Sequence, residues 1–194
     1  MQILHAFAGS IHEYNEQLAD PDRHRPFECP QCDGRKPLIA HGFYSRTIVS
    51  QEYDGTVRVR RYLCRFCQRT VSLLPEFALP YVRFAITVLA LFLKARLLDS
   101  HTLASAALAA GQPAMPYQRG QHWVRRFVGQ AAALSAALVS LTRPVAAVDF
   151  VARATTMLEN AGWILSHRFL FSKLRMHLLG WPRFLAPDGR VRTL

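Results

Sequence analysis

The sequence contains no apolar run long enough to cross a membrane. The longest runs are residues 84–93, bounded by Arg83 and Lys94, and the alanine-rich residues 131–141. A transmembrane helix needs about 20 apolar residues, so both runs are predicted to be buried helices. The first residues, MQILHAFAGSIHEYNE, also lack the basic start and the apolar core of a secretory signal. We therefore expect a cytoplasmic protein with reduced thiols.

Acidic residues are scarce. The chain has 13 Asp and Glu against 24 Lys and Arg, which gives a formal net charge of +11 in 194 residues. Such a charge favours a polyanionic partner, and arginine suits phosphate because its planar fork binds two oxygens at once. Nucleic acid is the first candidate partner and an anionic membrane surface the second. The apolar content of 51% is enough to bury a core, so a disordered chain is not expected.

The common catalytic motifs are missing as well. None of GxxxxGK[ST], GxGxxG, HExxH or GxSxG occurs, and the eight histidines form no i, i+4 pair. Phosphate-binding loops, dinucleotide folds, zinc proteases and hydrolases therefore lack a starting point, and no small-molecule substrate is evident. Residues 166–181 form a basic and aromatic helix that could lie on a membrane surface. We interpret it instead as part of a helical bundle or of a dimer interface.

The only four cysteines lie in two CxxC pairs. Cys29 and Cys32 form the first pair, Cys64 and Cys67 the second, and residues 33–63 separate them. Two such turns, brought together by a hairpin, give four sulfurs in the tetrahedral array that structural zinc prefers. A redox motif or disulfides are the alternative, but a thioredoxin-like pair needs a βαβ setting that is absent here. We predict one structural zinc ion.

Two histidines, His24 and His41, lie near the cysteines in the sequence. Either could replace a cysteine, but a lone histidine beside a complete set of four is interpreted as a bystander. The metal would supply folding energy to a segment of about 45 residues that cannot build a core alone.

A β pattern fills the segment between the cysteine pairs. Strands are predicted at residues 38–44, 46–51 and 56–63, with a hairpin turn at Asp54-Gly55. Alternation places Arg58 and Arg60 on one face of the last strand, opposite Val57, Val59 and Arg61. A solvated basic face is one interpretation. The other is contact with DNA phosphates through Arg46, Arg58, Arg60, Arg65 and Arg69.

After Pro75 and Pro80 the apolar period lengthens to about 3.6 residues. Helices are predicted at residues 82–97, 101–110, 116–129, 131–141, 147–160 and 163–179. Overall we expect an α+β protein, in which a small N-terminal zinc ribbon, a β-hairpin or three strands, precedes an all-α region. The expected parts are an N-terminal arm (1–26), the ribbon (27–75), a helical region (82–130), C-terminal helices (131–180) and a poorly ordered tail (181–194).

Residues 99–127 have the plan of a helix-turn-helix. Asp99 or Ser100 is predicted to cap the first helix, Gly111 ends it, and Trp123 and Phe127 are expected on the buried side of the second. A second helix of this kind enters the major groove. A plain helical hairpin is the alternative, because the connection is long and Gly120 weakens a helix by about 1 kcal/mol relative to alanine. The predicted base and phosphate contacts are Tyr117, Gln118, Arg119, Gln121, His122, Arg125 and Arg126.

The motifs CPQC, HGFYSR and RYLCRFCQRTVSLLPEF resemble the N-terminal zinc ribbon of bacterial insertion-sequence transposases and their helper proteins, with the helix-turn-helix directly behind it. More closely, the extended match through LLPEFALPY and the later QRGQHWVRRF resembles an uncharacterised family of bacterial transposase-like zinc-ribbon proteins. The resemblance covers roughly residues 1–130. It implies zinc ligands at the four cysteines and DNA binding through the ribbon and the helices.

The resemblance does not imply catalysis. A transposase of this kind needs an RNase H-like domain, in which three carboxylates hold two metal ions. The acidic residues after residue 130 are Asp149, Glu159 and Asp188, in a segment predicted to be helices and a tail. This segment is too short for such a domain and has no alternating strands. We therefore expect no enzyme, but a DNA-binding accessory or regulatory protein that could pair with a transposase or with itself. The alternative function is a zinc-stabilised protein interaction module that does not bind DNA.

Overall fold

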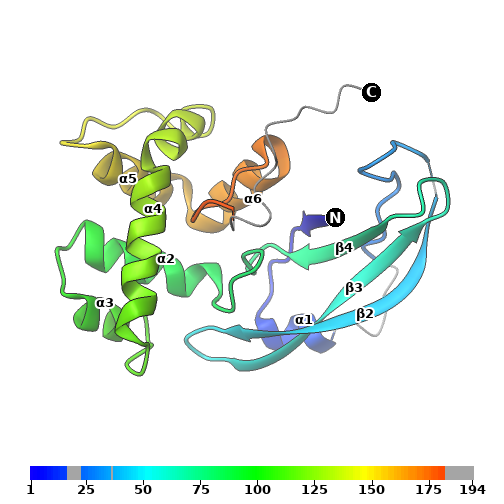
Figure 1. The fold of residues 1–194 in the computed structure, drawn as a ribbon, viewed down its shortest axis with the longest axis horizontal. Coiled ribbons are helices and arrows are strands. Elements are labelled where there is room, and N and C mark those ends of the chain that lie inside the picture. Colours follow the sequence, from blue (N-terminus) through cyan, green and yellow to red (C-terminus); the bar gives the residue numbers. More distant parts are fainter. Residues whose placement is uncertain (17–22, 36, 182–194) are drawn as a thin grey trace.

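The computed structural model describes residues 1–16, 23–35 and 37–181. Over these residues the chain is α+β, with a four-stranded sheet and six helices (Figure 1). The sheet and α1 (Ile11–Glu16) lie toward one end of the long axis, and the helices from α2 onwards gather toward the other. The α+β class predicted from the sequence is confirmed.

A long antiparallel hairpin forms half of the sheet. β2 (Leu38–Val49) pairs with β3 (Asp54–Cys64), from Leu38 opposite Cys64 to Val49 opposite Asp54. The prediction of two separate strands at 38–44 and 46–51 is wrong, because Ser45 pairs with Arg58 and β2 continues through it without a break. The register of β2 shifts earlier, between Ala40 and Phe43. Gly42 lies in this bulge with φ of 86°, a conformation that costs glycine little.

The hairpin turn also differs from the prediction. Asp54 and Gly55 are the first paired residues of β3, and the turn consists of residues 50–53, where the Ser50 amide donates to the Tyr53 carbonyl at 2.7 Å. The longer ladder places Ile48 and Val49 opposite Gly55 and Asp54, and both of these apolar side chains are buried. Burial of this pair therefore outweighs the local preference of Asp-Gly for a turn.

Two more strands complete the sheet, in the order β1-β4-β3-β2. β4 (Thr70–Pro75) runs antiparallel to β3, and β1 (Gln2–His5) runs parallel to β4. The Met1 ammonium group donates to the Thr70 carbonyl at 2.9 Å, and its pKa is lowered by burial and by nearby arginines. The predicted arm, residues 1–26, thus contains a strand and a helix, neither of which the sequence predicted.

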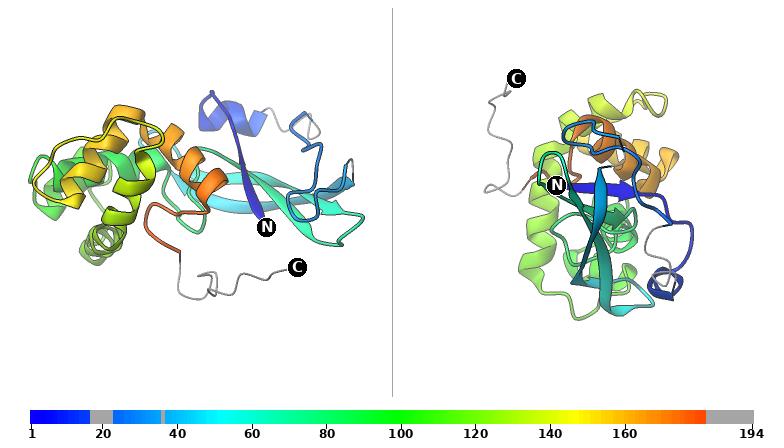
Figure 2. Two further views of the ribbon diagram at one scale, coloured as in Figure 1. Left: turned by 90° about the horizontal axis from the view of Figure 1, so that it is seen from above. Right: turned by 90° about the vertical axis from the view of Figure 1, so that its right-hand side faces the viewer.

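The sheet buries opposite faces at its two ends. Near the turn, Val57 and Val59 pack with Tyr14 of α1, which covers this face (Figure 2). Near the cysteines, Tyr62 and Cys64 are buried with Leu38, Val71 and Leu73. Because side chains alternate along a strand, the odd-numbered and even-numbered positions of β3 lie on different faces, and the buried face changes near residue 60.

The helical end contains α2 (Ile86–Leu97), α3 (Leu103–Ala109), α4 (Tyr117–Leu138), α5 (Phe150–Ala161) and α6 (Trp163–Leu174). The predicted helices 116–129 and 131–141 are one helix, α4. The sequence around residue 130 contains no proline, and alanine favours helix strongly enough to continue it. Gly129 is exposed in this helix and meets no neighbour, so it interrupts nothing.

Helix caps explain two of the boundaries. Thr102, not Asp99 or Ser100, caps α3: its hydroxyl accepts from the Ser105 amide at 3.1 Å. Asp149 caps α5 in the same way, accepting from the Ala152 amide at 2.7 Å. A side-chain oxygen at this position satisfies an amide that the helix leaves free.

Trp123 is buried in the main core, and the sequence predicted its burial. Its ring lies edge-on to Phe84 at 5.0 Å and to Phe92 at 5.4 Å between ring centroids, and Phe127 is fully buried one turn later. A Cβ atom at Gly120 would lie 2.9 Å from the Phe92 ring. Gly120 is therefore the residue that lets α4 approach α2, rather than a weak point of the helix.

No helix in the described part of the chain is both long and apolar enough to span a membrane. The division into parts at residues 26, 75, 82 and 130 stays a prediction. The predicted tail, residues 181–194, lies outside the described residues except for Trp181, and so does Asp188. The Trp181 indole donates to the Arg175 carbonyl at 2.7 Å.

Candidate metal centre

The two cysteine pairs form turns of nearly identical geometry. In the first turn, the Cys29 amide donates to the Gly34 carbonyl at 3.0 Å, and the Asp33 amide donates to the Cys29 carbonyl at 2.9 Å. In the second turn, the same two bonds join Cys64 to Arg69 and Gln68 to Cys64, both at 3.0 Å.

The backbone turns back at equivalent residues. Asp33 and Gln68, each directly after the second cysteine of its pair, have φ of 53° and 56°. Non-glycine residues adopt this left-handed conformation at a cost, so its occurrence at both positions indicates a shared requirement. In each turn it leaves the two thiols facing the same point.

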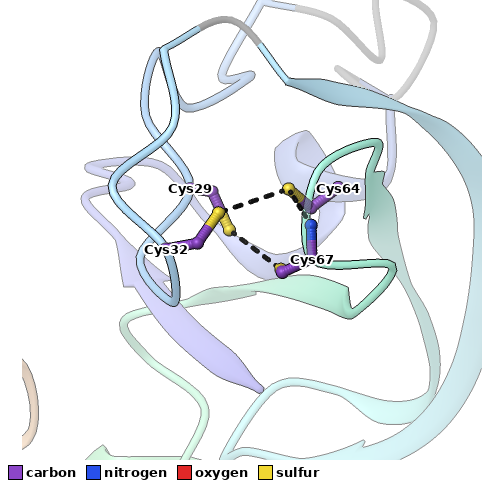
Figure 3. A group of neighbouring side chains, drawn as sticks. All are labelled: Cys29, Cys32, Cys64 and Cys67. Atoms are coloured by element: carbon purple, nitrogen blue, oxygen red, sulfur yellow. Dashed lines mark hydrogen bonds between the residues drawn. The ribbon is translucent and has the colours of Figure 1, made fainter. Parts of the chain in front are cut away.

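The hairpin brings the two turns together. Leu38, at the start of β2, pairs with Cys64 at the end of β3, so the chain returns to where it left the first turn. The Sγ atoms of Cys29 and Cys67 are 3.8 Å apart, those of Cys32 and Cys64 are 3.7 Å apart, and all four lie within 4.8 Å of one another (Figure 3).

These distances fit one tetrahedral metal ion. With metal–sulfur bonds of about 2.3 Å, a regular tetrahedron has S–S edges of about 3.8 Å. A disulfide needs about 2.05 Å between the sulfurs, and all four cysteines are free thiols. Four thiolates around one point are the ligand set of zinc or of an iron–sulfur centre. The cysteines are therefore positioned to bind a metal ion, as the sequence predicted.

The environment favours thiolate at one position. Burial raises the pKa of the Cys64 thiol, but the backbone N–H groups of Cys67 and Phe66 and the neighbouring thiols outweigh it and lower this pKa to about 7. The Gly34 amide lowers the pKa of Cys32, yet burial and the other three thiols raise it to about 12. Four thiols this close cannot all ionise without a cation.

The four sulfurs have an apolar, buried side and an exposed side that carries a basic residue. Cys29 and Cys64 are buried against the cluster around Tyr62, while Cys32 is exposed. Arg69 lies on the exposed side and donates to the Gln31 side chain at 3.1 Å. The predicted bystander His24 stacks on His5 at 4.9 Å between ring centroids, which is consistent with that interpretation.

The predicted DNA contacts on α4 lie on its exposed side. Trp123 and Phe127 are buried on the opposite side, as expected. Arg126 differs, because its guanidinium donates to the carbonyls of Leu179, Gly180 and Trp181. The exposed residues are Tyr117, Gln118, Arg119, Gln121, His122 and Arg125.

On the sheet, two predicted contacts are engaged within the fold. Arg60 is only 8% exposed, and its guanidinium lies over the Phe43 and Tyr62 rings. Arg58 and Arg60 share one face of β3, as predicted, because the Arg58 guanidinium also lies over the Phe43 ring, 4.3 Å from its centroid. The expectation that Arg60 is solvated is wrong, because the buried face of β3 changes near residue 60. Arg46 donates to the carbonyls of Leu79 and Val82. Arg58, Arg65 and Arg69 remain exposed.

Three exposed residues near these contacts were not predicted. Phe66, at the tip of the second cysteine turn, is 68% exposed, and Tyr81 and Arg83 lie in the segment between β4 and α2. Phe66 could have been singled out, since an aromatic residue inside a CxxC pair has no core to join. No sequence pattern relates Arg83 to α4, because their proximity arises only from tertiary packing.

Comparison with known proteins gives one family. Neither the curated proteins nor the solved structures contain a match. Residues 29–109 match the family described as a domain of unknown function, DUF6431. The matched segment includes the β2–β3 hairpin, β4, α2 and α3. Both cysteine pairs, and so the candidate metal centre, lie within it.

Proposed function

We propose that this protein is a zinc-dependent DNA-binding protein of transposase-like origin, which acts as an accessory or regulatory factor. The observation that carries the proposal is the exposed face of α4, where glutamine, arginine and histidine side chains lie opposite a buried Trp123 and Phe127. Arginine and glutamine are the residue types that bind guanine and adenine edges. The net charge of +11 points to the same partner.

The metal centre would serve the DNA-binding surface as a support. Zinc is the ion we propose, because four thiolates with tetrahedral spacing are typical of structural zinc sites. It would fix the two cysteine turns and, through them, Arg65 and Arg69, which flank Cys64 and Cys67 on the exposed side. No chemistry on a substrate is assigned to this ion.

The proposed contacts lie at two ends of the hairpin. Arg65 and Arg69 lie at the cysteine end, whereas the turn at residues 50–53 reaches the start of the helical region, where the Gln112 side chain donates to the Ser50 carbonyl at 3.1 Å. The ten residue steps from Asp54 to Cys64 span about 33 Å. One turn of B-DNA is about 34 Å, so both ends could contact one duplex.

We also propose that the chain has no catalytic activity of its own. Asp149 caps α5, and the Glu159 carboxylate pairs with Lys94 at 3.1 Å and accepts from the Trp163 indole. Both carboxylates thus have structural partners. A transposase, or a second copy joined through the C-terminal helices, is the protein partner we propose, and the cytoplasm is the proposed location.

A salt titration of DNA affinity tests this function. The probe is a duplex of about 20 base pairs, two helical turns, added to metal-loaded protein and to chelator-treated protein. We expect the logarithm of the binding constant to fall with the logarithm of salt concentration with a slope of several units. We also expect chelation to abolish the binding. Affinity absent even at low salt would contradict the proposal.

One observation favours a protein partner as a second candidate. Phe66 is 68% exposed beside the metal centre. Aromatic residues are enriched in protein–protein interfaces relative to the rest of the surface. Under this alternative, zinc would still stabilise the fold, but the protein would show no salt-sensitive affinity for DNA.

A further inference from the structure

A basic hollow lies where the segment between β4 and α2 passes α4. Its volume is about 330 Å³, and three elements line it: residues 80–83, the N-terminal half of α4, and residues 177–180. Arg83 comes from the first element, and Arg119 and His122 come from α4. We call this site the basic hollow.

The charge of the basic hollow is of one sign. Three arginines, Arg83, Arg119 and Arg126, line it together with His122, and no acidic residue is among its described lining. A neighbouring hollow shares Tyr81, Val82 and Arg83 with it, and Arg46 is among its other lining residues. By contrast, the larger hollow beside α6 contains Glu76 and Glu159 as well as basic residues.

The arginines are held in place by contacts within the fold. Arg126 is fixed by three carbonyls at residues 179–181. The Arg119 guanidinium lies over the Phe84 ring, 5.6 Å from its centroid, a contact with the face of the group that leaves its N–H edges for other acceptors. Arg83 uses Nη2 to bind the exposed Asp54 at 2.8 Å. Such fixed donors lower the ordering cost of binding an anion.

Residues 80–83, which line the basic hollow, include a residue with an unusual backbone conformation. Tyr81, one of the residues that line the hollow, has φ of 61° although it is not glycine, and it is 51% exposed. The segment is pinned because Arg46 donates to the carbonyls of Leu79 and Val82, which flank Pro80 and Tyr81 in the chain. Backbone strain that the surrounding structure maintains is concentrated at functional sites.

We propose that the basic hollow binds one backbone phosphate of bound DNA, with Arg83 and Arg119 as its direct ligands. The inference rests on the proposed DNA binding and adds a defined phosphate site to it. Two arginine forks from different elements converge on one small hollow, and the planar fork of arginine matches the geometry of phosphate oxygens.

The pKa of His122, which lines the hollow, can report whether a phosphate is bound there. Its pKa is lowered by burial and by the charges of Arg126, Arg125 and Arg119. His177, which also lines the hollow, has its pKa lowered to about 4, chiefly by burial, and is neutral near pH 7. A phosphate placed among these groups would reverse the unfavourable field at His122 and raise its pKa.

The test compares Arg83→Gln, Arg119→Gln and the double variant with Arg143→Gln. The control removes the same charge at an exposed arginine beyond the C-terminal end of α4. Each protein is titrated with salt against the duplex of about 20 base pairs. A lost phosphate contact lowers the salt slope by about 0.9 and the affinity at 0.1 M salt about eightfold.

The double variant decides whether the two arginines share one phosphate. If they do, its salt slope is reduced by about 0.9 in total, as in either single variant. The control keeps the wild-type slope. In the wild-type protein, the NMR titration of His122 moves to higher pH when the duplex is added.

The outcomes separate this inference from the proposed function. If the wild-type protein does not bind the duplex at low salt, the proposed function is wrong. If it binds, but Arg83→Gln and Arg119→Gln behave as Arg143→Gln does and the His122 titration is unmoved, DNA binding stands and the phosphate site is wrong. Circular dichroism confirms that each variant is folded, and the His122 measurement requires no variant.

Discussion

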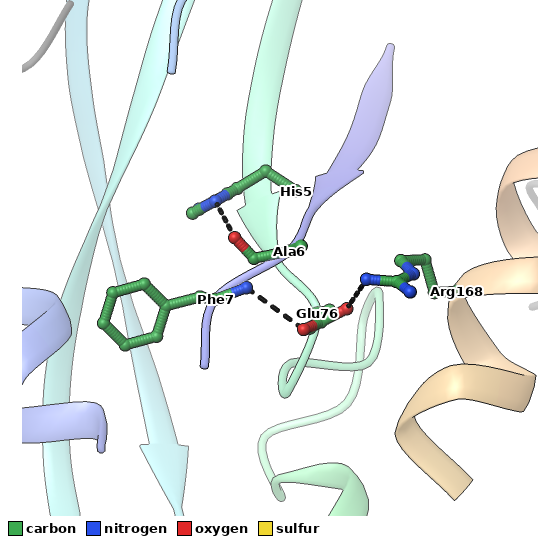
Figure 4. Close-up of polar contacts among 5 residues, drawn as sticks. All are labelled: His5, Ala6, Phe7, Glu76 and Arg168. Atoms are coloured by element: carbon green, nitrogen blue, oxygen red, sulfur yellow. Dashed lines mark hydrogen bonds and ion pairs between the residues drawn. The ribbon is translucent and has the colours of Figure 1, made fainter. Parts of the chain in front are cut away.

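Glu76 and Arg168 form an ion pair that joins the sheet to the helical end of the molecule. Oε2 of Glu76 accepts from Arg168 Nη1 at 3.0 Å, while its Oε1 accepts from the Phe7 amide at 3.0 Å (Figure 4). One carboxylate thus connects the residue after β4, the chain after β1, and α6. The Glu76 side chain is almost fully buried, whereas Arg168 is partly exposed.

We expect Glu76→Gln to lower the free energy of unfolding by about 1–3 kcal/mol, because it leaves Arg168 without its charged partner in a partly buried site. Asp54→Asn is the matched control, since it breaks an ion pair with Arg83 that is exposed on both sides and is worth about 0–1 kcal/mol. Urea denaturation measures both. Equal losses in the two variants would contradict a special role for Glu76.

Gly120→Ala should destabilise the protein, although alanine favours helix. The new methyl group would lie 2.9 Å from the fully buried Phe92 ring, and such overpacking costs about 1–3 kcal/mol. Gly129→Ala, in the same helix, meets nothing within 4 Å and should stabilise by about 0.5–1 kcal/mol. The midpoint of thermal unfolding should therefore fall in Gly120→Ala and rise in Gly129→Ala. A higher midpoint in both variants would contradict close packing of Gly120 against Phe92.

Metal content should be one ion per chain by elemental analysis. Cys64→Ser should lower it, because it removes one of four ligands and leaves the others without a complete tetrahedron. His41→Asn, which changes a nearby histidine outside the cluster, should leave the content unchanged. Chelation should increase hydrogen exchange around residues 29–35 and 64–69 before it affects α4. Full metal content in Cys64→Ser would contradict the site.

Acid should destabilise the fold through two buried histidines. Burial lowers the pKa of His167 to about 3 and that of His177 to about 4, whereas an unfolded histidine titrates near a pKa of about 6.5. Their contribution is therefore present above about pH 6.5 and is lost as the pH falls toward about 4, because the unfolded chain binds more protons. Each histidine should contribute a slope of about 1.4 kcal/mol per pH unit in this range.

His167→Leu isolates this effect from loss of metal, which acid also causes. The variant keeps the four cysteines and lacks one buried titrating group. Its unfolding free energy should fall less steeply between about pH 6 and pH 4, by about 1.4 kcal/mol per pH unit. Identical slopes for the variant and the wild-type protein would show that His167 does not titrate in this way.

Local patterns carried most of the sequence predictions that the structure confirms. The spacing of Cys29 and Cys32 fixes a turn within a few residues, and so does that of Cys64 and Cys67, which is why the metal cluster could be predicted. The burial of Trp123 and Phe127 follows from helical spacing in the same way. The two cysteine turns and the burial of α4 depend on neighbours along one element, whereas the hairpin between the cysteine pairs brings the two turns together.

The predictions that failed depend on contacts between distant segments. β1 has four residues and pairs only with β4, far along the chain. So short a strand shows no alternation of apolar and polar residues from which it could be predicted. The fate of Arg60 depends on which face of β3 is covered at that point. Arg83 and Arg119 line the same hollow because of packing between distant segments. Phe84, which follows Arg83 in the chain, packs on Trp123 of α4 and lies under the Arg119 guanidinium.

The parallel pairing of β1 with β4 gives the metal a role in the order of folding. β1 is synthesised before the other three strands of this sheet, yet it pairs only with β4, across a loop of about 65 residues. Once both cysteine turns bind one ion, the chain between them no longer counts toward the loop, and about 27 residues remain. The free-energy cost of closing the loop then falls by about 0.8 kcal/mol. The ion would thus shorten the loop that separates β1 from β4 and favour their pairing. Chains folded without the metal should therefore complete the sheet more slowly.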